Sequence, residues 1–100
     1  MPSTTIPATP DSELVMRAFT AFFKFDRDMS RGLPSLELSE TTTWNNRPYV
    51  VLRNADAVVA IYRFHARQDQ LKKLRKPPKS LLLRYLSEDQ LKNYRYIKSQ

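Results

Sequence analysis

The stretch WNNRPYVVLRNADAVVAIYRFH, residues 44–65, decides the fold of this chain. Residues 49–53 and 57–64 are rich in β-branched and aromatic side chains, which favour strands. Residues 54–56, Asn-Ala-Asp, lie between them and are typical turn residues, although the glycine common at a left-handed turn position is absent. The stretch therefore predicts a β-hairpin.

The second predicted strand is apolar on both of its faces. Strand residues alternate between the two faces of a sheet, so we expect one face to carry Val59, Ile61 and Arg63, and the other to carry Val58, Ala60, Tyr62 and Phe64. Because both rows are mostly apolar, this strand is expected to be central in its sheet and covered on both sides.

The next segment, residues 70–76, is basic and admits two structures. As a third strand it would place Lys72 and Leu74 on one face and Lys73 on the other; as a helical turn it would be capped by Asp69. The segment is short for a helix and is followed by Pro77-Pro78, so we favour an edge strand. Lysines on an edge strand also prevent sheets from aggregating, which explains their presence without any ligand.

A helix is predicted before the hairpin. Residues 1–9 are rich in Pro, Ser and Thr and are expected to be disordered. Thr9 and Pro10 then suit a helix start, and residues 14–29 have helical periodicity that ends near Gly32. The expected core stripe consists of Leu14, Ala18, Phe22, Phe25 and Met29. Residues 35–42 are interpreted as a connector, with a possible short strand at 36–38.

The apolar surface of this helix is wider than one small sheet would cover. Met16, Phe19 and Phe23 lie outside the core stripe, towards a second side of the helix. Either the C-terminal helix packs on them, or they form an interface with a second copy or another protein.

The C-terminal region carries a clear helix signal. Ser87 and Gln90 form a capping box, and Leu86 and Leu91 occupy the positions of a hydrophobic staple. A helix is predicted over residues 88–98, with Leu91, Tyr94 and Ile97 on one face. Residues 80–86 are expected to form a short helix or an apolar segment packed on the core.

Together these elements predict an α+β fold in one domain, residues 10–100. It consists of an N-terminal helix, a three-stranded antiparallel β-meander and one or two C-terminal helices. A small barrel-like sheet with helical flanks is the alternative.

The net charge of +7 is concentrated in one part of the chain. Residues 1–62 contain six Lys or Arg and seven Asp or Glu, whereas residues 63–79 contain seven basic residues and one acid, Asp69. Such a local excess is typical of a surface that binds an anionic partner. The candidate contact residues are Arg63, Arg67, Lys72, Lys73, Arg75, Lys76 and Lys79, together with Trp44, whose neighbours in sequence are polar.

The residue types argue against catalysis, cofactors and metals. A single glycine is too few for a P-loop or a dinucleotide-binding turn, and the chain has no cysteine and one histidine, His65. No apolar run reaches the roughly 20 residues of a membrane-spanning helix, and the N-terminus does not resemble a secretory signal. We therefore expect a cytoplasmic protein that is not an enzyme.

The leading hypothesis is a small binding or adaptor module. Its basic surface, residues 63–79, would dock on an acidic protein partner or a multi-subunit assembly. Sequence-nonspecific binding of nucleic acid by the same surface is the alternative, but the chain has no RNP1 octet, G-x-x-G loop or zinc-finger spacing. A homodimer through Met16, Phe19 and Phe23 is compatible with either hypothesis.

Overall fold

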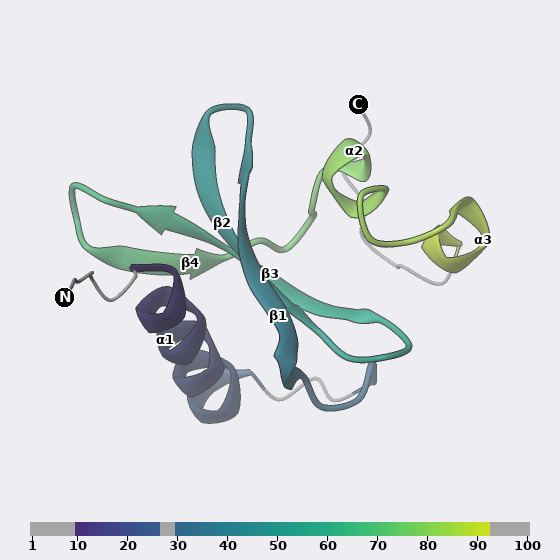
Figure 1. Cartoon of the computed structure of the whole chain (residues 1–100), viewed down its shortest axis with the longest axis horizontal. Coiled ribbons are helices and arrows are strands. Elements are labelled where there is room, and N and C mark those ends of the chain that lie inside the picture. Colours follow the sequence, from purple (N-terminus) through teal and green to yellow (C-terminus); the bar gives the residue numbers. More distant parts are fainter. Residues whose placement is uncertain (1–9, 27–29, 93–100) are drawn as a thin grey trace, which may run out of the picture.

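The chain forms one helix, then a four-stranded sheet, then two short helices (Figure 1). The computed structural model describes residues 10–26 and 30–92, with side chains from Glu13 onward, so the tail predicted to be disordered at 1–9 lies outside the described residues. In chain order the elements are α1 (Pro10–Phe25), β1 (Ser35–Trp44), β2 (Arg47–Arg53), β3 (Val58–His65), β4 (Gln70–Lys73), α2 (Lys79–Leu82) and α3 (Glu88–Leu91).

The sheet is an open antiparallel meander. Its strands lie in the order β1-β2-β3-β4, the same as their order in the chain, and each pair of neighbours is antiparallel. The α+β class and the hairpin of residues 49–64 are confirmed, and the segment predicted as an edge strand over 70–76 forms one over Gln70–Lys73. The prediction of three strands is wrong, because β1 adds a fourth. The barrel-like alternative is wrong too, because β1 and β4 remain two separate edges.

The missed strand β1 depends on a tight turn. Asn45 and Asn46 have φ angles of 54° and 61°, and Trp44 pairs directly with Arg47 across them. Two consecutive left-handed residues are typical of a type I′ turn, whose twist matches that of a β-hairpin, and asparagine tolerates this conformation better than most residues. Residues 35–44 therefore pair with β2 instead of forming a connector.

The sheet is covered on both faces by different parts of the chain. On one face α1 packs over the central strands and encloses a cluster of Leu14, Val15, Ala18, Phe22, Val50, Leu52, Val59, Ala60 and Tyr62. On the other face the C-terminal segment encloses Tyr49, Val51, Val58, Ile61, Leu81, Leu82, Leu86 and Leu91. Figure 1 shows α1 on one side of β3–β4, and α2 and α3 on the opposite side of the sheet, towards its far end.

A β-bulge changes the expected alternation of β3. Leu52 pairs with Ala60 but Arg53 pairs with Val58, so Val59 is an extra residue opposite β2. Val59 therefore lies in the cluster under α1 together with Ala60, and not beside Ile61 as strict alternation predicts. Beyond the bulge the expected alternation of Ile61, Tyr62 and Arg63 is restored.

The helix α1 starts where the sequence predicts but its described part ends at Phe25. Leu14, Ala18 and Phe22 are buried as expected, whereas Phe25 is 72% exposed and is not part of the core. Its side chain instead lines an open groove between α1 and β4. Met29, the last member of the predicted stripe, lies outside the described residues.

The C-terminal segment confirms the predicted cap. The Ser87 hydroxyl accepts a hydrogen bond from the Gln90 backbone N–H, the Gln90 side chain accepts one from Ser87 N–H, and Leu86 and Leu91 are both buried. Residues 80–86 contribute the short helix α2 and three buried leucines to the second cluster. Tyr94 and Ile97 lie outside the described residues. Across the described helices, none combines the length and apolar character needed to cross a bilayer.

The turn between β2 and β3 is held by the side chain of Asn54. Its Oδ1 accepts hydrogen bonds from the N–H groups of Asp56 and Ala57, and its Nδ2 donates to the carbonyls of Arg31 and Leu33. Gly32 lies between those carbonyls at a φ of 85°, where an added Cβ would be 3.0 Å from Asn54 Nδ2. One side chain therefore fixes the hairpin and the segment that leads into β1.

Replacing Asn54 should separate these two roles. Asn54→Asp keeps the acceptor oxygen for the turn but loses both donated bonds, whereas Asn54→Ala loses all four. With about 0.5–1.5 kcal/mol per hydrogen bond, we expect Asn54→Ala to lower the free energy of unfolding by about 2–6 kcal/mol and Asn54→Asp by less. Urea unfolding of the three proteins measures this. Equal losses would show that the bonds to Arg31 and Leu33 carry the whole effect.

Candidate functional site

Four basic side chains lie on one open part of the sheet, on the face away from α1. Tyr49 pairs with Arg63, and Arg63 pairs with Lys72, so these three side chains share a face. Arg47 and His65 lie two residues from Tyr49 and Arg63 respectively, which places them on the same face. We call the patch formed by Arg47, Arg63, His65 and Lys72 the basic sheet face.

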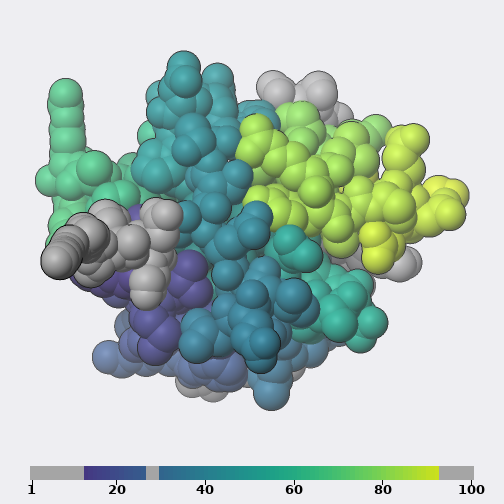
Figure 2. Space-filling model, viewed as in Figure 1, coloured from purple at the N-terminus to yellow at the C-terminus, as the bar shows by residue number. Residues whose placement is uncertain are grey.

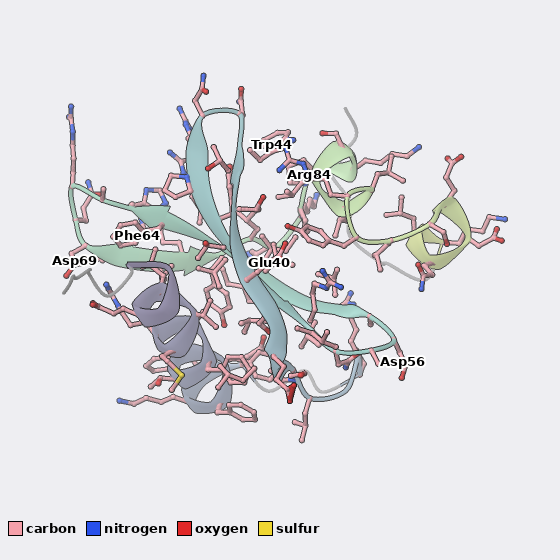
Figure 3. The ribbon with its side chains drawn as sticks, in the orientation of Figure 1. Glu40, Trp44, Asp56, Phe64, Asp69 and Arg84 are labelled. Carbon is pink, nitrogen blue, oxygen red and sulfur yellow. The ribbon has the colours of Figure 1, made fainter. Side chains whose placement is uncertain are left out.

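The two hairpins of the sheet frame this patch. Figure 1 shows the β1–β2 hairpin and the β3–β4 hairpin diverging from each other, and Figure 2 shows the surface hollowed between their tips. In Figure 3 several nitrogen-tipped side chains rise from β3–β4 into this space, on the side away from α1. The helices α2 and α3 cover the other half of the same sheet face, so the patch is left accessible.

The pKa of His65 indicates that the cations of the basic sheet face lie close to one another. Partial desolvation lowers the pKa of its imidazole, and the positive charges of Arg63, Lys72 and Arg47 lower it further. Three cations from three strands thus act on one ring. These charges favour the neutral imidazole in the free protein, and a bound anion would favour its protonation.

Within the described part of the chain, these cations have no acidic partner. Arg63 and Lys72 are directly opposed like charges, an arrangement that destabilises a sheet. The Nε of Arg63 is enclosed and has no hydrogen-bond partner among the described residues. The folded protein carries an electrostatic cost that a bound anion would offset.

The acids nearest to β4 are held on the opposite face. Arg17 of α1 donates to the Asp69 carboxylate at 2.9 Å and to the Asp69 carbonyl at 2.8 Å, so the one acid within 63–79 is held towards α1. Lys73 forms an ion pair with Asp26, at the end of α1. Lys73 therefore lies on the α1 side and is not part of the basic sheet face, although Lys72 next to it is.

The negative charge of Asp26 also acts inside the core. Burial raises the pKa of the Tyr62 hydroxyl to about 12, and Asp26 adds to the shift. Tyr62 pairs with Lys73 across β3 and β4 and stays protonated throughout the physiological range. It is thus a neutral core residue under α1, and not a contact residue of the basic sheet face.

The other predicted basic residues lie around β4 without joining the sheet face. Arg67 is in the turn before β4, Arg75 and Lys76 are in the segment after it, and Lys79 begins α2. All four are exposed. The basic residues of 63–79 are therefore divided between the basic sheet face, the α1 side of the sheet and four positions in loops or at the start of α2.

Trp44 lies at the border of the basic sheet face. Its indole N–H donates to the Ser80 hydroxyl at 3.1 Å, and its ring packs edge-on against Tyr49, with ring centroids 6.1 Å apart. It is half-buried against the second cluster, and Figure 3 shows it between the β1–β2 hairpin and α2, near Arg84. Because its partner in the strand register is Arg47, its fluorescence should respond to a ligand on this face.

Two members of the basic sheet face were not among the residues predicted from the sequence. Arg47 was overlooked because β1 and its turn were not predicted, so nothing placed it beside Arg63. His65 was considered only as a catalytic or metal-binding residue. The signal for Arg47 is the Asn45-Asn46 turn, which sets the register of β1 and extends β2 back to Arg47. The signal for His65 is the alternation of β3, which places it on the face of Arg63.

The predicted oligomer residues are only partly exposed. Met16 and Phe23 are 50% and 52% exposed, whereas Phe19 packs against the cluster under α1. Met16 also lines the groove between α1 and β4, together with Phe25 and Leu71. The apolar surface of α1 is thus carried by Met16, Phe23 and Phe25, and a dimer through it stays a prediction.

No group of three or more histidine, cysteine or acidic side chains within residues 13–26 and 30–92 could hold a metal ion. Comparison of the chain with protein-family models, curated protein sequences and solved structures gives no match. A function therefore has to be inferred from the geometry and charge of the site.

Neighbouring lysines on β4 should have opposite effects on stability. Lys72→Gln removes a like charge opposite Arg63 and should raise the free energy of unfolding by about 0.2–1 kcal/mol. Lys73→Gln removes a partner of a nearly buried carboxylate, that of Asp26, and should lower the free energy of unfolding by about 1–2 kcal/mol. Urea unfolding at low salt and at high salt measures both, and the gain from Lys72→Gln should shrink in high salt. A loss of stability in both variants would contradict this view of the two faces.

Phe23→Ser tests the predicted dimer. If a second copy covers Phe23, the variant should be a monomer in sedimentation velocity under conditions where the original protein is a dimer. Its free energy of unfolding per chain should change little, because the side chain is half-exposed in the single chain. A monomeric original protein at a concentration of about 100 µM would rule out a stable dimer.

Proposed function

We propose that this chain is a non-catalytic binding module that docks an acidic segment of a protein partner, alone or within an assembly, on the basic sheet face. The observation that carries the proposal is the segregation of charge on the sheet. Arg47, Arg63 and Lys72 lie together on an open face, while Asp26 and Asp69 are bound to Lys73 and Arg17 on the other. Such complementarity steers an acidic partner to one face and fixes its orientation.

The positions of the aromatic residues favour a protein partner over nucleic acid. Proteins that bind single strands combine a basic groove with exposed aromatic rings on which successive bases stack. Here Tyr49 is buried, and Tyr62 and Phe64 lie in or against the cluster under α1. Trp44 is half-buried, and its N–H is bonded to Ser80. The described part of this face thus offers at most one ring for stacking.

The surroundings of His65 support binding without catalysis. A histidine base is normally oriented and supported by a carboxylate or another acceptor. The groups that act on His65 are three cations, which disfavour the protonated imidazole that a general base must become. The same cations suit the electrostatic binding of an anion.

An acidic peptide of about a dozen residues tests the proposal, with the fluorescence of Trp44 as the readout. We expect a Kd on the order of 10 µM near physiological salt, which corresponds to about −7 kcal/mol. The double variant Arg47→Glu/Lys72→Glu should weaken binding at least about tenfold, or by about 1.4 kcal/mol. The matched control Lys24→Glu/Lys92→Glu makes the same change in net charge at exposed positions away from this face.

Three results would contradict the proposal. The first is no binding of the acidic peptide near physiological salt. The second is an equal loss of affinity in both double variants, which would mean that net charge alone attracts the peptide. The third is tighter binding of single-stranded or duplex oligonucleotides with a steep salt dependence, which would favour a nucleic-acid partner.

A further inference from the structure

The cations of the basic sheet face form a compact group and not a row. Arg63 and Lys72 are direct cross-strand partners, and neighbouring strands are about 4.8 Å apart. His65 lies two residues, about 7 Å, beyond Arg63 on β3, and Arg47 lies two residues beyond Tyr49, the partner of Arg63 on β2, where the two hairpins begin to diverge (Figure 1). The charges of Arg47, Arg63 and Lys72 all act on the imidazole of His65, so the three cations lie around one part of the face. One small, multiply charged group can therefore contact all of them together.

The charge of the group also favours a dianion over a single carboxylate. Arg47, Arg63 and Lys72 contribute three positive charges with no acid among them in the described residues, and His65 can add a fourth when an anion is bound. A carboxylate brings one negative charge. A phosphate monoester brings about 1.5 to 2 and three strong acceptor oxygens.

We propose that the basic sheet face is a binding site for a phosphate monoester, presented by a phosphorylated serine or threonine in the acidic partner. This inference rests on the proposed function, since it specifies which group of the acidic segment occupies the face. The two guanidinium groups can each offer paired N–H donors to phosphate oxygens, and Lys72 adds a mobile point charge. Recognition of phosphorylated motifs by clusters of arginine is a known mode of peptide binding.

His65 gives the site a direct readout. In the free protein the surrounding cations lower the pKa of its imidazole. A phosphate dianion bound among Arg47, Arg63 and Lys72 favours the imidazolium, so the pKa of His65 should rise on binding. Because Gln70, the cross-strand partner of His65, is uncharged, no side chain of β4 directly opposite it competes for this effect.

The test compares two peptides of equal net charge. One carries a single phosphoserine among acidic residues, and the other has two glutamates in place of the phosphoserine and a neutral neighbour. We expect the phosphopeptide to bind at least about tenfold more tightly, as followed by Trp44 fluorescence. The NMR titration of the His65 ring should show a higher pKa in the phosphopeptide complex than in the glutamate complex.

Conservative variants identify the donors responsible. Arg47→Lys and Arg63→Lys keep the charge but lose the paired N–H groups, so each should reduce the preference for phosphoserine more than it reduces binding of the glutamate peptide. Because Arg63 is half-buried, its replacement also changes packing, so Arg47→Lys, at an exposed position, provides the same test without that change. Arg75→Lys is the matched control, and it should leave the preference unchanged.

The outcomes separate this inference from the proposed function. Equal affinity for the two peptides would overturn the phosphate site and leave the acidic docking face intact, whereas no affinity for either would overturn both. Inorganic phosphate should displace the phosphopeptide at millimolar concentration, and sodium chloride of equal ionic strength should do so less well. An oligonucleotide that displaces the bound phosphopeptide at a lower concentration than unlabelled phosphopeptide does would point to nucleic acid as the ligand. That result would overturn the assignment.

Discussion

The central constraint on this structure is that β2 and β3 are apolar on both faces. Val50 and Leu52 of β2 point to one side of the sheet, and Tyr49 and Val51 point to the other. Water must be excluded from both sides, so a single sheet of four strands needs two covering layers. The helix α1 supplies one of them over its 16 residues. The other layer is supplied by α2, α3 and the segments around them. As described, each of these two helices has four residues.

This unequal coverage determines where a binding face can exist. The C-terminal segment reaches Val51, Val58 and Ile61, but the hairpin ends of the sheet continue beyond it. On the α1 side the same strand ends are occupied by Arg17 and Asp26, which neutralise Asp69 and Lys73. On the other side the strand ends are open and bear Arg47, Arg63 and Lys72, while the acid Glu40 on that face lies further along β1, opposite Val51. The proposed binding face is thus the part of the sheet that the fold leaves without a cover.

Much of the fold follows from local sequence, because the decisive signals are local. The hairpin of residues 49–64, the cap at Ser87 and the buried stripe of α1 each depend on residues within one turn or one strand. The strand β1 could be missed because its sequence, SLELSETTTW, is polar and mostly exposed, and its pairing depends on the left-handed Asn45 and Asn46. The bulge at Val59 could not be read from alternation, since one inserted residue is detected only through the register with β2.

The candidate site was harder to predict than the fold. A count of charges along the sequence does not show which face of the sheet each side chain lies on. Lys72 and Lys73 are adjacent and chemically identical, yet one faces Arg63 and the other faces Asp26. Arg47 is distant in sequence from the basic run, yet it acts on the same imidazole as Lys72. Which charges act together therefore depends on the face that each strand residue occupies and on the register between strands. Both are defined only once the strands are paired.

The electrostatic cost of the basic sheet face is itself an argument for binding. A sheet can protect an edge from aggregation with lysines that point into solvent, and β4 alone would satisfy that need. Protection of the edge does not require Arg63, which lies directly opposite Lys72 on β3, one strand in from the edge. It does not require Arg47 on β2 either. Placing like charges in adjacent strands lowers the stability of the free protein. An anion bound on this face would recover that stability, so the unfavourable contacts of the free state would add to the driving force of the proposed association.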